Sequence, residues 1–388
     1  MKIIPYILII QLFMSQTCVT IRKSEQQDVK KRMFEFAQKS IESNNTPGLQ
    51  YVLVTAEGTV HSFSLGFADV KLKQLMTTNT SQMIYSMTKT FTAAAILKLN
   101  AEGKLDIERP LSDYLPDNPY GSKVLIKQLL SQSSGLPNPI PLSWVHLASE
   151  HPQYNENQEL SEILAKHPEL SFEPGTKYGY SNLSYWLLGK LISVTSGSTY
   201  EEYMKKEILS PLGLRATEVG FKIPNDKFHA KGYIKKWSII DLLSEYFLDK
   251  KFIGSYEGDW LNIQNHYLNG PAYGGMIASA DAVSIFLIDQ LKENSKILNP
   301  KAKSLFYEQQ KTKDGYLIPM TLGWHIEEIR SNKISFFYKE GGGAGYHSEM
   351  RIYPNQKFAS VVIANCIGFD VKEFLNHLDN EYIESLKR

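Results

Sequence analysis

The sequence is poor in cysteine and in net charge. Its 388 residues include two cysteines, Cys18 and Cys366, and 42 basic residues nearly balance 41 acidic ones. A balanced chain offers no basic field for nucleic acid and no polybasic patch for a membrane surface. If Cys18 is removed with an N-terminal signal, one cysteine remains and a disulfide within the chain is excluded. We therefore expect no nucleic-acid partner and no disulfide framework.

Long apolar runs are also missing, apart from one at the start of the chain. Met1-Lys2 precedes an apolar run from Ile3 to Met14, and small and polar residues follow before Arg22. One positive charge, about a dozen apolar residues and a polar exit are typical of a secretory signal, and the run is short for a membrane span. The pattern predicts a signal peptide over 1–20 and an exported bacterial protein, periplasmic or secreted, with no stable membrane insertion after cleavage.

Strand patterns lie toward both ends of the chain and helical patterns lie between them. Residues 49–66 read as a β-hairpin with a turn at Glu57-Gly58, and the period shifts to two again from Lys333 to Asn365. Amphipathic helical patterns occupy 24–41 and 371–386. These patterns predict an α+β fold: an antiparallel five-stranded sheet flanked by N- and C-terminal helices, with a large inserted all-helical lobe.

The same patterns give an expected domain organisation. We predict a single domain over 24–388, in which a sheet lobe takes in about 24–85 and 301–388 and a helical lobe takes in about 86–300. Residues 234–268 are rich in aromatic side chains. Two interpretations stay open for that segment: a helix that packs within its own domain, or a lid that adds apolar walls to a pocket.

A serine and a lysine stand three residues apart where the helical run begins. The run follows Tyr85, contains Ser86 and Lys89, and ends near Gly103. Residues three apart lie on the same helix face, so the Lys89 amine can reach the Ser86 hydroxyl. A lysine base needs a pKa about three units below its usual value, which burial and a second cation can supply. Alone, this spacing is weak evidence, because a chain of this length contains a few such pairs by chance, and it favours a helix start with a solvated lysine.

Two further stretches carry chemically useful residues. Tyr180-Ser181-Asn182 follows a loop with proline and glycine and begins another helical pattern. Lys339-Glu340-Gly341-Gly342 lies at the end of a predicted strand. Glycines at such a place let a reacting carbonyl come close, and their backbone N–H groups can form an oxyanion site.

The three stretches occur in the order of a known set of motifs. With Ser86-x-x-Lys89, Tyr180-x-Asn182 and Lys339-x-Gly341, the sequence resembles the serine β-lactamase and penicillin-binding protein superfamily. The tyrosine that begins the second motif indicates the branch of class C β-lactamases, D-alanyl-D-alanine carboxypeptidases and esterases. The resemblance covers about 47–366 and implies a β-lactamase/transpeptidase-like fold.

The resemblance implies roles for individual residues. Ser86 is the nucleophile that becomes acylated, and Lys89 and Tyr180 share the general-base and general-acid work. Asn182 binds a substrate amide and the Lys89 head group. The remaining substrate-binding residues are those of the third motif, Lys339, Gly341 and Gly342, with the N–H groups of Ser86 and Gly342 as the oxyanion site. Tyr180 would act as a base only if flanking cations, Lys89 and Lys339, lower its pKa.

Two departures from the family pattern bear on the substrate. Glu340 stands where relatives with strong β-lactamase activity often have threonine, and it would repel a substrate carboxylate unless it points away or pairs with Lys339. Ser131-Gln132-Ser133 replaces a commoner Thr-His-Thr, which we interpret as a neutral packing change.

The expected activity is that of a serine acyl hydrolase acting on a small molecule or peptide: a β-lactam, a D-amino-acid peptide or a carboxylic ester. The alternative is a penicillin- or peptidoglycan-binding sensor of the same fold that turns over slowly or not at all. A purely structural surface protein would leave the three motifs unexplained. No metal or cofactor is expected, since the nine histidines form no HExxH pattern. Gly179–Leu183 is a poor nucleophile elbow for an α/β-hydrolase because it lacks the closing glycine. The sequence does not predict the oligomeric state.

Overall fold

The computed structural model describes residues 27–139, 144–329 and 333–387. The predicted signal peptide lies outside these residues. The chain divides into two compact units, one formed by Thr46–Val371 and the other by the described parts of Met1–Asn45 and Lys372–Arg388. The domain boundaries expected from the sequence stay a prediction.

The smaller unit consists of two helices, 27–42 and most of α11 (Val371–Leu386). Both amphipathic patterns are therefore confirmed as helices. Within this unit, the Phe36 ring stacks on the His377 ring with centroids 3.7 Å apart. The Arg32 guanidinium donates a hydrogen bond of 2.9 Å to the Glu381 carboxylate. An aromatic contact and an ion pair thus join the two helices to each other.

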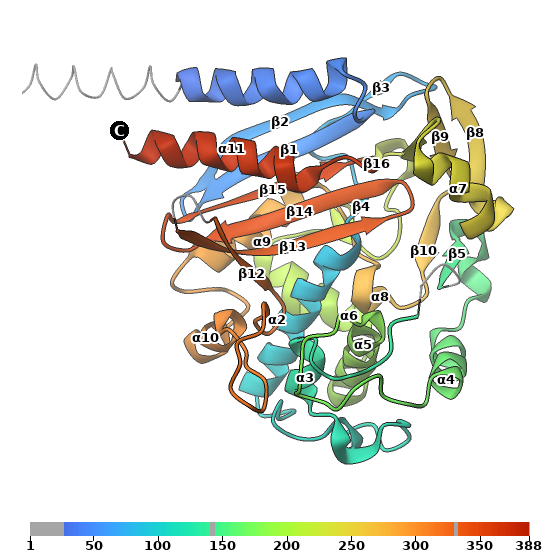
Figure 1. The fold of residues 1–388 in the computed structure, drawn as a ribbon, viewed down its shortest axis with the longest axis vertical. Coiled ribbons are helices and arrows are strands. Elements are labelled where there is room, and N and C mark those ends of the chain that lie inside the picture. Colours follow the sequence, from blue (N-terminus) through green and yellow to red (C-terminus); the bar gives the residue numbers. More distant parts are fainter. Residues whose placement is uncertain (1–26, 140–143, 330–332, 388) are drawn as a thin grey trace, which may run out of the picture. The chain divides into compact units, whose positions relative to one another are not determined.

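The larger unit contains an antiparallel sheet of seven strands in the order β12-β13-β14-β15-β1-β2-β3 (Figure 1). The α+β fold is confirmed, whereas the expected number of five strands is wrong. The two extra strands are the edge strands β3 and β12. β3 has two residues, and β12 reads His-Ile-Glu-Glu-Ile, which lacks the alternation of apolar and polar residues that marks a half-buried strand. The strands are β1 (Gly48–Thr55), β2 (Gly58–Asp69), β3 (Gln74–Leu75), β12 (His325–Ile329), β13 (Ile334–Gly343), β14 (Tyr346–Tyr353) and β15 (Phe358–Ala364).

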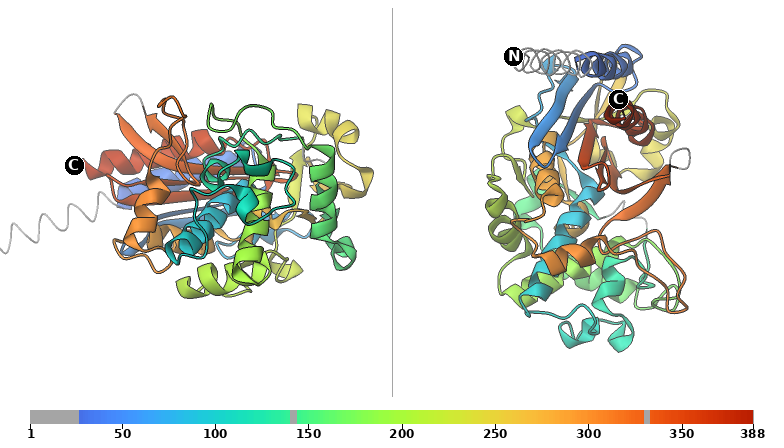
Figure 2. Two further views of the ribbon diagram at one scale, coloured as in Figure 1. Left: turned by 90° about the horizontal axis from the view of Figure 1, so that it is seen from below. Right: turned by 90° about the vertical axis from the view of Figure 1, so that its left-hand side faces the viewer.

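The middle of the chain is mostly helical. Figure 1 shows most of its helices below the sheet, with α7 beside the right-hand end of the sheet and α9 behind it, and Figure 2 shows the same arrangement from two other sides. The helices are α2 (Thr88–Ala101), α3 (Ile126–Leu130), α4 (Glu156–Lys166), α5 (Asn182–Ser196), α6 (Tyr200–Tyr203), α7 (Ile239–Phe247), α8 (Pro271–Gly274), α9 (Ala280–Leu291) and α10 (Pro300–Tyr307).

The expectation of an all-helical lobe is wrong, because short strands form three small sheets beside these helices. Tertiary pairing of two to five residues leaves too little periodicity to be read from a sequence. These strands are β4 (Gln82–Met83), β5 (Val145–Leu147), β6 (Val219–Gly220), β7 (Gly232–Lys235), β8 (Ile253–Glu257), β9 (Trp260–Ile263), β10 (His266–Leu268), β11 (Ile277–Ala278) and β16 (Cys366–Ile367).

Helix α2 is buried on nearly every side. All its residues from Thr88 to Leu97 are buried, and the run Ala93-Ala94-Ala95 lets neighbouring elements come close. Small side chains on all faces explain why α2 can pack against α5, α8 and α10 at once. The start of α2, where Ser86 lies, is therefore held from several directions. Within the described part of the chain, no helix has the length and apolar character needed to cross a bilayer.

Candidate active site

Ser86 lies on a 3₁₀ turn, Tyr85–Met87, that leads directly into α2. Its neighbour Tyr85 has a φ of +43°, a left-handed conformation that is strained for a bulky residue. The Tyr85 hydroxyl donates a hydrogen bond of 2.8 Å to the Ala344 carbonyl and lies 3.0 Å from His266 Nε2. The side chain of Tyr85 thus holds its own strained backbone in place through these contacts. The turn leaves the Ser86 hydroxyl half-buried.

Lys89 lies one helical turn after Ser86, as its spacing predicts. Its Nζ is 2.9 Å from Ser86 Oγ, and it donates hydrogen bonds to Asn182 Oδ1 at 2.8 Å and to the Tyr273 carbonyl at 2.6 Å. The side chain is completely buried. Burial, and after it the charge of Lys339, lowers the pKa of Lys89 well below its ordinary value. Both influences were expected of a lysine base, namely desolvation and a second cation.

Tyr180 reaches the same serine from the loop before α5. Its Oη lies 2.8 Å from Ser86 Oγ. The Nζ atoms of Lys89 and Lys339 lie 5.0 and 5.2 Å from the centroid of its ring, so the two expected lysines do flank it. Burial nevertheless raises the pKa of Tyr180, although the hydrogen bond to Ser86 opposes that rise. The condition under which Tyr180 could act as a base, a lowered pKa, is therefore not met, and in the free protein the phenol is protonated at neutral pH.

The other predicted polar residues meet at this point. Asn182 is the first residue of α5, and its amide oxygen accepts the hydrogen bond from Lys89 described above. Lys339 comes from β13, and its ammonium is buried with no hydrogen-bond partner among the described residues. Burial lowers the pKa of Lys339 to about 7, and the charge of Glu340 works against that fall. An unpartnered buried amine is costly to keep unless a ligand completes it.

The glycines of the third motif allow β13 to lie directly against the serine turn. A Cβ atom on Gly341 would stand 2.1 Å from the main-chain oxygen of Ile84, and one on Gly343 would stand 2.3 Å from the Tyr85 ring. Any larger residue would push the strand and the turn apart. Gly342 lines the same cavity as Ser86, which places both expected oxyanion residues at one site. Their role stays a prediction.

Glu340 points away from Lys339. Its carboxylate lies 2.6 Å from His347 Nε2 on β14, and its side chain is 50% exposed. Burial alone would lower the pKa of His347, but the hydrogen bonds to Glu340 and to the Phe369 carbonyl, with the nearby negative charge, raise it overall. Glu340 was expected to repel a substrate carboxylate unless it pointed away or paired with Lys339, and in the structure it points away.

Gln132 is a supporting residue whose importance the sequence did not reveal. It is buried with a φ of +56°. Its carbonyl accepts a hydrogen bond of 2.8 Å from Gly179 N, and its Oε1 accepts one of 2.7 Å from Ser181 N. Both donors are immediate neighbours of Tyr180. The interpretation of Ser131-Gln132-Ser133 as a neutral packing change is therefore wrong, because Gln132 holds the loop that delivers the phenol.

His325 is a second residue near the site that sequence reasoning missed. Its Nε2 lies 3.2 Å from Tyr178 Oη, and its ring stacks at 6.4 Å on the ring of Tyr180. Burial, followed by the charges of Lys339 and Lys89, lowers the pKa of His325 to about 2. The ring is therefore neutral and adds no third positive charge. Since it stands on the edge strand β12, which the sequence did not predict, no signal marked it.

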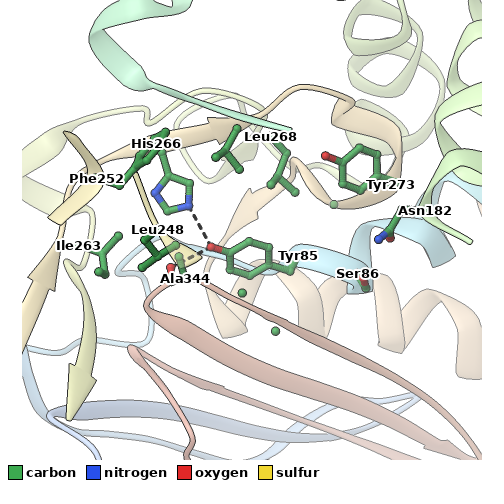
Figure 3. Close-up of a pocket in the computed structure, with 14 residues that line it drawn as sticks. Tyr85, Ser86, Asn182, Leu248, Phe252, Ile263, His266, Leu268, Tyr273 and Ala344 are labelled. Atoms are coloured by element: carbon green, nitrogen blue, oxygen red, sulfur yellow. Dashed lines mark hydrogen bonds between the residues drawn. The ribbon is translucent and has the colours of Figure 1, made fainter. Parts of the chain in front are cut away.

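A cavity of about 130 Å³ opens beside Ser86 (Figure 3). Of the two interpretations of residues 234–268, the structure supports the one in which they add apolar walls to a pocket. That segment supplies five of the lining side chains, and Figure 3 shows them grouped around the ring of Tyr85: Leu248, Phe252, Ile263, His266 and Leu268.

Fold and site together define a class of protein: an α+β domain in which a serine hydroxyl, a buried amine and a phenol meet beside the glycine-rich end of an antiparallel strand. The chain belongs to the Beta-lactamase family, whose family model matches residues 26–379.

Curated relatives are similar over most of this chain. Protein flp of Staphylococcus aureus (strain MW2) is 26% identical over 357 residues, which are 88% of this chain and 64% of that protein. Penicillin-binding protein 4* of Bacillus subtilis (strain 168) is 26% identical over 321 residues, 81% of this chain and 67% of that protein. The chain thus spans just under two thirds of the length of flp.

Solved structures share the fold. The D-amino acid amidase from Ochrobactrum anthropi SV3, complexed with L-phenylalanine amide, matches with a TM-score of 0.73 at 20% identity, covering 94% of this chain and 99% of that one. The octameric penicillin-binding protein homologue from Pyrococcus abyssi matches with a TM-score of 0.71 at 22% identity, covering 92% and 77%. A class C β-lactamase matches with a TM-score of 0.71 at 18% identity, covering 93% and 97%.

Proposed function

We propose that this protein is an exported serine hydrolase that cleaves an ester or amide through a covalent acyl-enzyme on Ser86. One observation carries the proposal: Ser86 Oγ lies within hydrogen-bonding distance of both Lys89 Nζ and Tyr180 Oη. A nucleophile beside a base, with the base held by a third group, is the arrangement that activates a hydroxyl. Membership of the Beta-lactamase family supports the same reaction class.

The hydrogen bonds around Lys89 are compatible with a neutral amine that acts as the base. A neutral amine has two N–H donors and one lone pair. The Asn182 amide oxygen and the Tyr273 carbonyl accept the two hydrogens. The third neighbour of Nζ is Ser86 Oγ, so once the amine is neutral its lone pair faces the hydroxyl whose proton must be removed. The lowered pKa of Lys89 supports the same state.

Tyr180 complements Lys89 as the acid. In acylation, Ser86 Oγ bonds to the carbonyl carbon while its proton passes to Lys89, and the leaving group departs with the proton of the Tyr180 phenol. The resulting phenolate lies beside the ammonium groups of Lys89 and Lys339. In deacylation, the phenolate takes a proton from the attacking water, and Lys89 returns its proton to the departing Ser86 oxygen. The protons balance over the cycle.

The carbonyl oxygen of the substrate would lie between the backbone N–H groups of Ser86 and Gly342. Both residues line the cavity, and Gly341 and Gly343 allow the approach of β13 that brings them together. A donor of this kind typically contributes about 3–4 kcal/mol to lowering the barrier. If the substrate carries an amide, Asn182 is its expected contact. If the substrate carries an anionic group, Lys339 is the expected contact for that group.

Labelling with a fluorophosphonate probe tests the nucleophile. We expect one adduct by intact mass at Ser86 in the parent protein, none in Ser86→Ala, and full labelling in Ser255→Ala, a matched change at an exposed serine. Absence of an adduct in the folded parent protein would overturn the proposal. A burst of one equivalent of p-nitrophenol without steady-state release would instead favour the slowly turning-over sensor.

Substrate choice and export need their own measurements. A panel of nitrocefin, p-nitrophenyl esters and D-Ala-D-Ala peptides separates the three substrate classes. Export rests on the apolar run from Ile3 to Met14. It predicts that protein secreted by a bacterial host has an intact mass lower by roughly the first 20 residues. Retention of the full-length chain in the cytoplasm would contradict it.

A further inference from the structure

The cavity beside Ser86 has no charged side chain among the residues that line it. Its walls come from five separate parts of the chain, which are the serine turn, the segment around β5, the start of α5, the segment from α7 to α8 and the end of β13. The lining residues are Tyr85, Ser86, Val145, Asn182, Leu248, Phe252, Ile263, His266, Leu268, Tyr273, Gly274, Gly342, Gly343 and Ala344. Most of this surface is aliphatic, aromatic or glycine, so a group that enters the cavity gains apolar contacts and no ionic partner.

Apart from the groups that meet the substrate at Ser86, Asn182 and Gly342, the polar side chains of the lining already have partners within the protein. The Tyr85 hydroxyl donates to the Ala344 carbonyl at 2.8 Å and lies 3.0 Å from His266 Nε2. His266 Nδ1 lies 2.9 Å from the Gln264 carbonyl. Burial lowers the pKa of His266, which favours the uncharged ring. The neutral ring donates its Nδ1–H to the Gln264 carbonyl, so its Nε2 is an acceptor and shares the single Tyr85 hydrogen with the Ala344 carbonyl. None of these groups offers a charged ligand an ionic partner, so such a ligand would be desolvated without compensation.

The position of the cavity assigns it to one side of the scissile bond. Ser86 and Gly342 line the cavity, whereas Tyr180 and Lys339 do not. The leaving group must lie against Tyr180, because that phenol supplies its proton in the proposed mechanism. The other substituent of the carbonyl carbon, the acyl side, then lies toward the cavity.

We propose that this cavity binds the acyl group of the substrate and selects an uncharged, apolar one, of about the size of a phenyl ring or a chain of four to six carbons. The inference rests on the proposed function. Its size limit follows from volume, since an apolar cavity of about 150 Å³ holds benzene and this one measures about 130 Å³. Leu248, Phe252 and Ile263 are the specificity-determining residues, because they form the wall that faces the Tyr85 ring (Figure 3).

A series of p-nitrophenyl esters with one leaving group tests the selection. Burying a methylene is worth about 0.8 kcal/mol, so kcat/KM should rise about fourfold per methylene from acetate to hexanoate and level off or fall by decanoate. The hemisuccinate ester carries a carboxylate at a similar chain length to the valerate. The kcat/KM of the hemisuccinate should be at least about 100-fold lower than that of the valerate, because the carboxylate would be buried without a partner.

Variants connect the selection to the wall. Leu248→Asn places an amide in the cavity and should lower the hexanoate-to-acetate ratio of kcat/KM about tenfold. Leu72→Asn is the matched control, since Leu72 is 72% exposed and does not line the cavity. If Leu248→Asn fails to fold, Val145→Thr keeps the side-chain volume while adding a hydroxyl, and it should lower the same ratio.

The outcomes separate the inference from the proposed function. A parent protein that labels at Ser86 with fluorophosphonate but shows a flat chain-length profile, or prefers the hemisuccinate, overturns the apolar selection and leaves the hydrolase standing. A change of ratio in Leu72→Asn as large as that in Leu248→Asn also overturns it. Failure of the parent protein to label at Ser86 refutes the proposed function itself, and the inference falls with it.

Discussion

Two buried amines share one phenol in this site, and replacing the outer one should change the titration of the inner one. Lys89 Nζ and Lys339 Nζ lie 5.0 and 5.2 Å from the centroid of the Tyr180 ring, so they are no more than about 10 Å apart. At an effective dielectric constant near 20, two unit charges at about 10 Å repel by about 1.7 kcal/mol, or just over one pKa unit. The pKa of Lys339 is about 7, so this repulsion acts in the acidic range, where Lys339 is protonated.

Lys339→Met removes the charge and keeps a side chain of similar length. Lys89 must be unprotonated to act as the base, so a rise in its pKa moves the acid limb of the reaction to higher pH. We expect that limb to move up by about one pH unit in Lys339→Met.

The assay is the second-order rate of Ser86 labelling by an uncharged fluorophosphonate, measured against pH, because this probe has no carboxylate for Lys339 to bind. Lys313→Met is the control, since Lys313 is a half-exposed lysine paired with Glu173 on the surface. An acid limb that stays in place in a folded Lys339→Met protein would show that Lys89 is not the titrating base. The assignment of the general base would then have to be abandoned.

Three further changes test other parts of the site. Tyr180→Phe should lower kcat for a p-nitrophenyl ester about 10²- to 10⁴-fold with little change in Tm, because it removes the acid and leaves the ring; parental kcat would refute the role. Gly341→Ala should destabilise the fold by on the order of 2 kcal/mol and slow Ser86 labelling, because its Cβ would stand 2.1 Å from a main-chain oxygen. The control Gly220→Ala should have neither effect, because a Cβ at that position meets nothing within 4 Å. Because the pKa of His347 is raised in the folded state, the stability it gains from Glu340 is complete below about pH 6.5 and is lost as the pH rises through the raised value. Tm measured between about pH 5 and 9 should show this loss, and Glu340→Gln should remove it.

The centre of the site could be predicted because its geometry is local. A separation of three residues on a helix fixes the distance between Ser86 and Lys89 whatever the rest of the fold does. Tyr180 and Lys339 are far away along the chain, so their placement depended on the resemblance in motif order and not on periodicity. The hairpin of β1 and β2 was equally local, with its turn signal and its alternating residues.

The parts that could not be predicted depend on tertiary contacts. Gln132 acts through its carbonyl and its amide oxygen on a loop that lies more than forty residues away. Nothing in its neighbours marks it as the support of Tyr180. The direction of the Tyr180 pKa depends likewise on burial, which outweighs the hydrogen bond to Ser86, and the sequence does not show that burial.

The orientation of Glu340 likewise could not be predicted from the strand pattern alone. Successive residues of a strand point to opposite faces. The predicted strand ended at Lys339, whereas β13 continues to Gly343. Counted from the buried Ile334 and Phe336, strict alternation would put Glu340 on their face, whereas in the structure Lys339 is buried and Glu340 is exposed. The carboxylate can then raise the pKa of Lys339 through space while its oxygen stays with His347. An acid at this position is therefore compatible with an anionic substrate group at Lys339, and it helps to keep that lysine protonated near neutral pH.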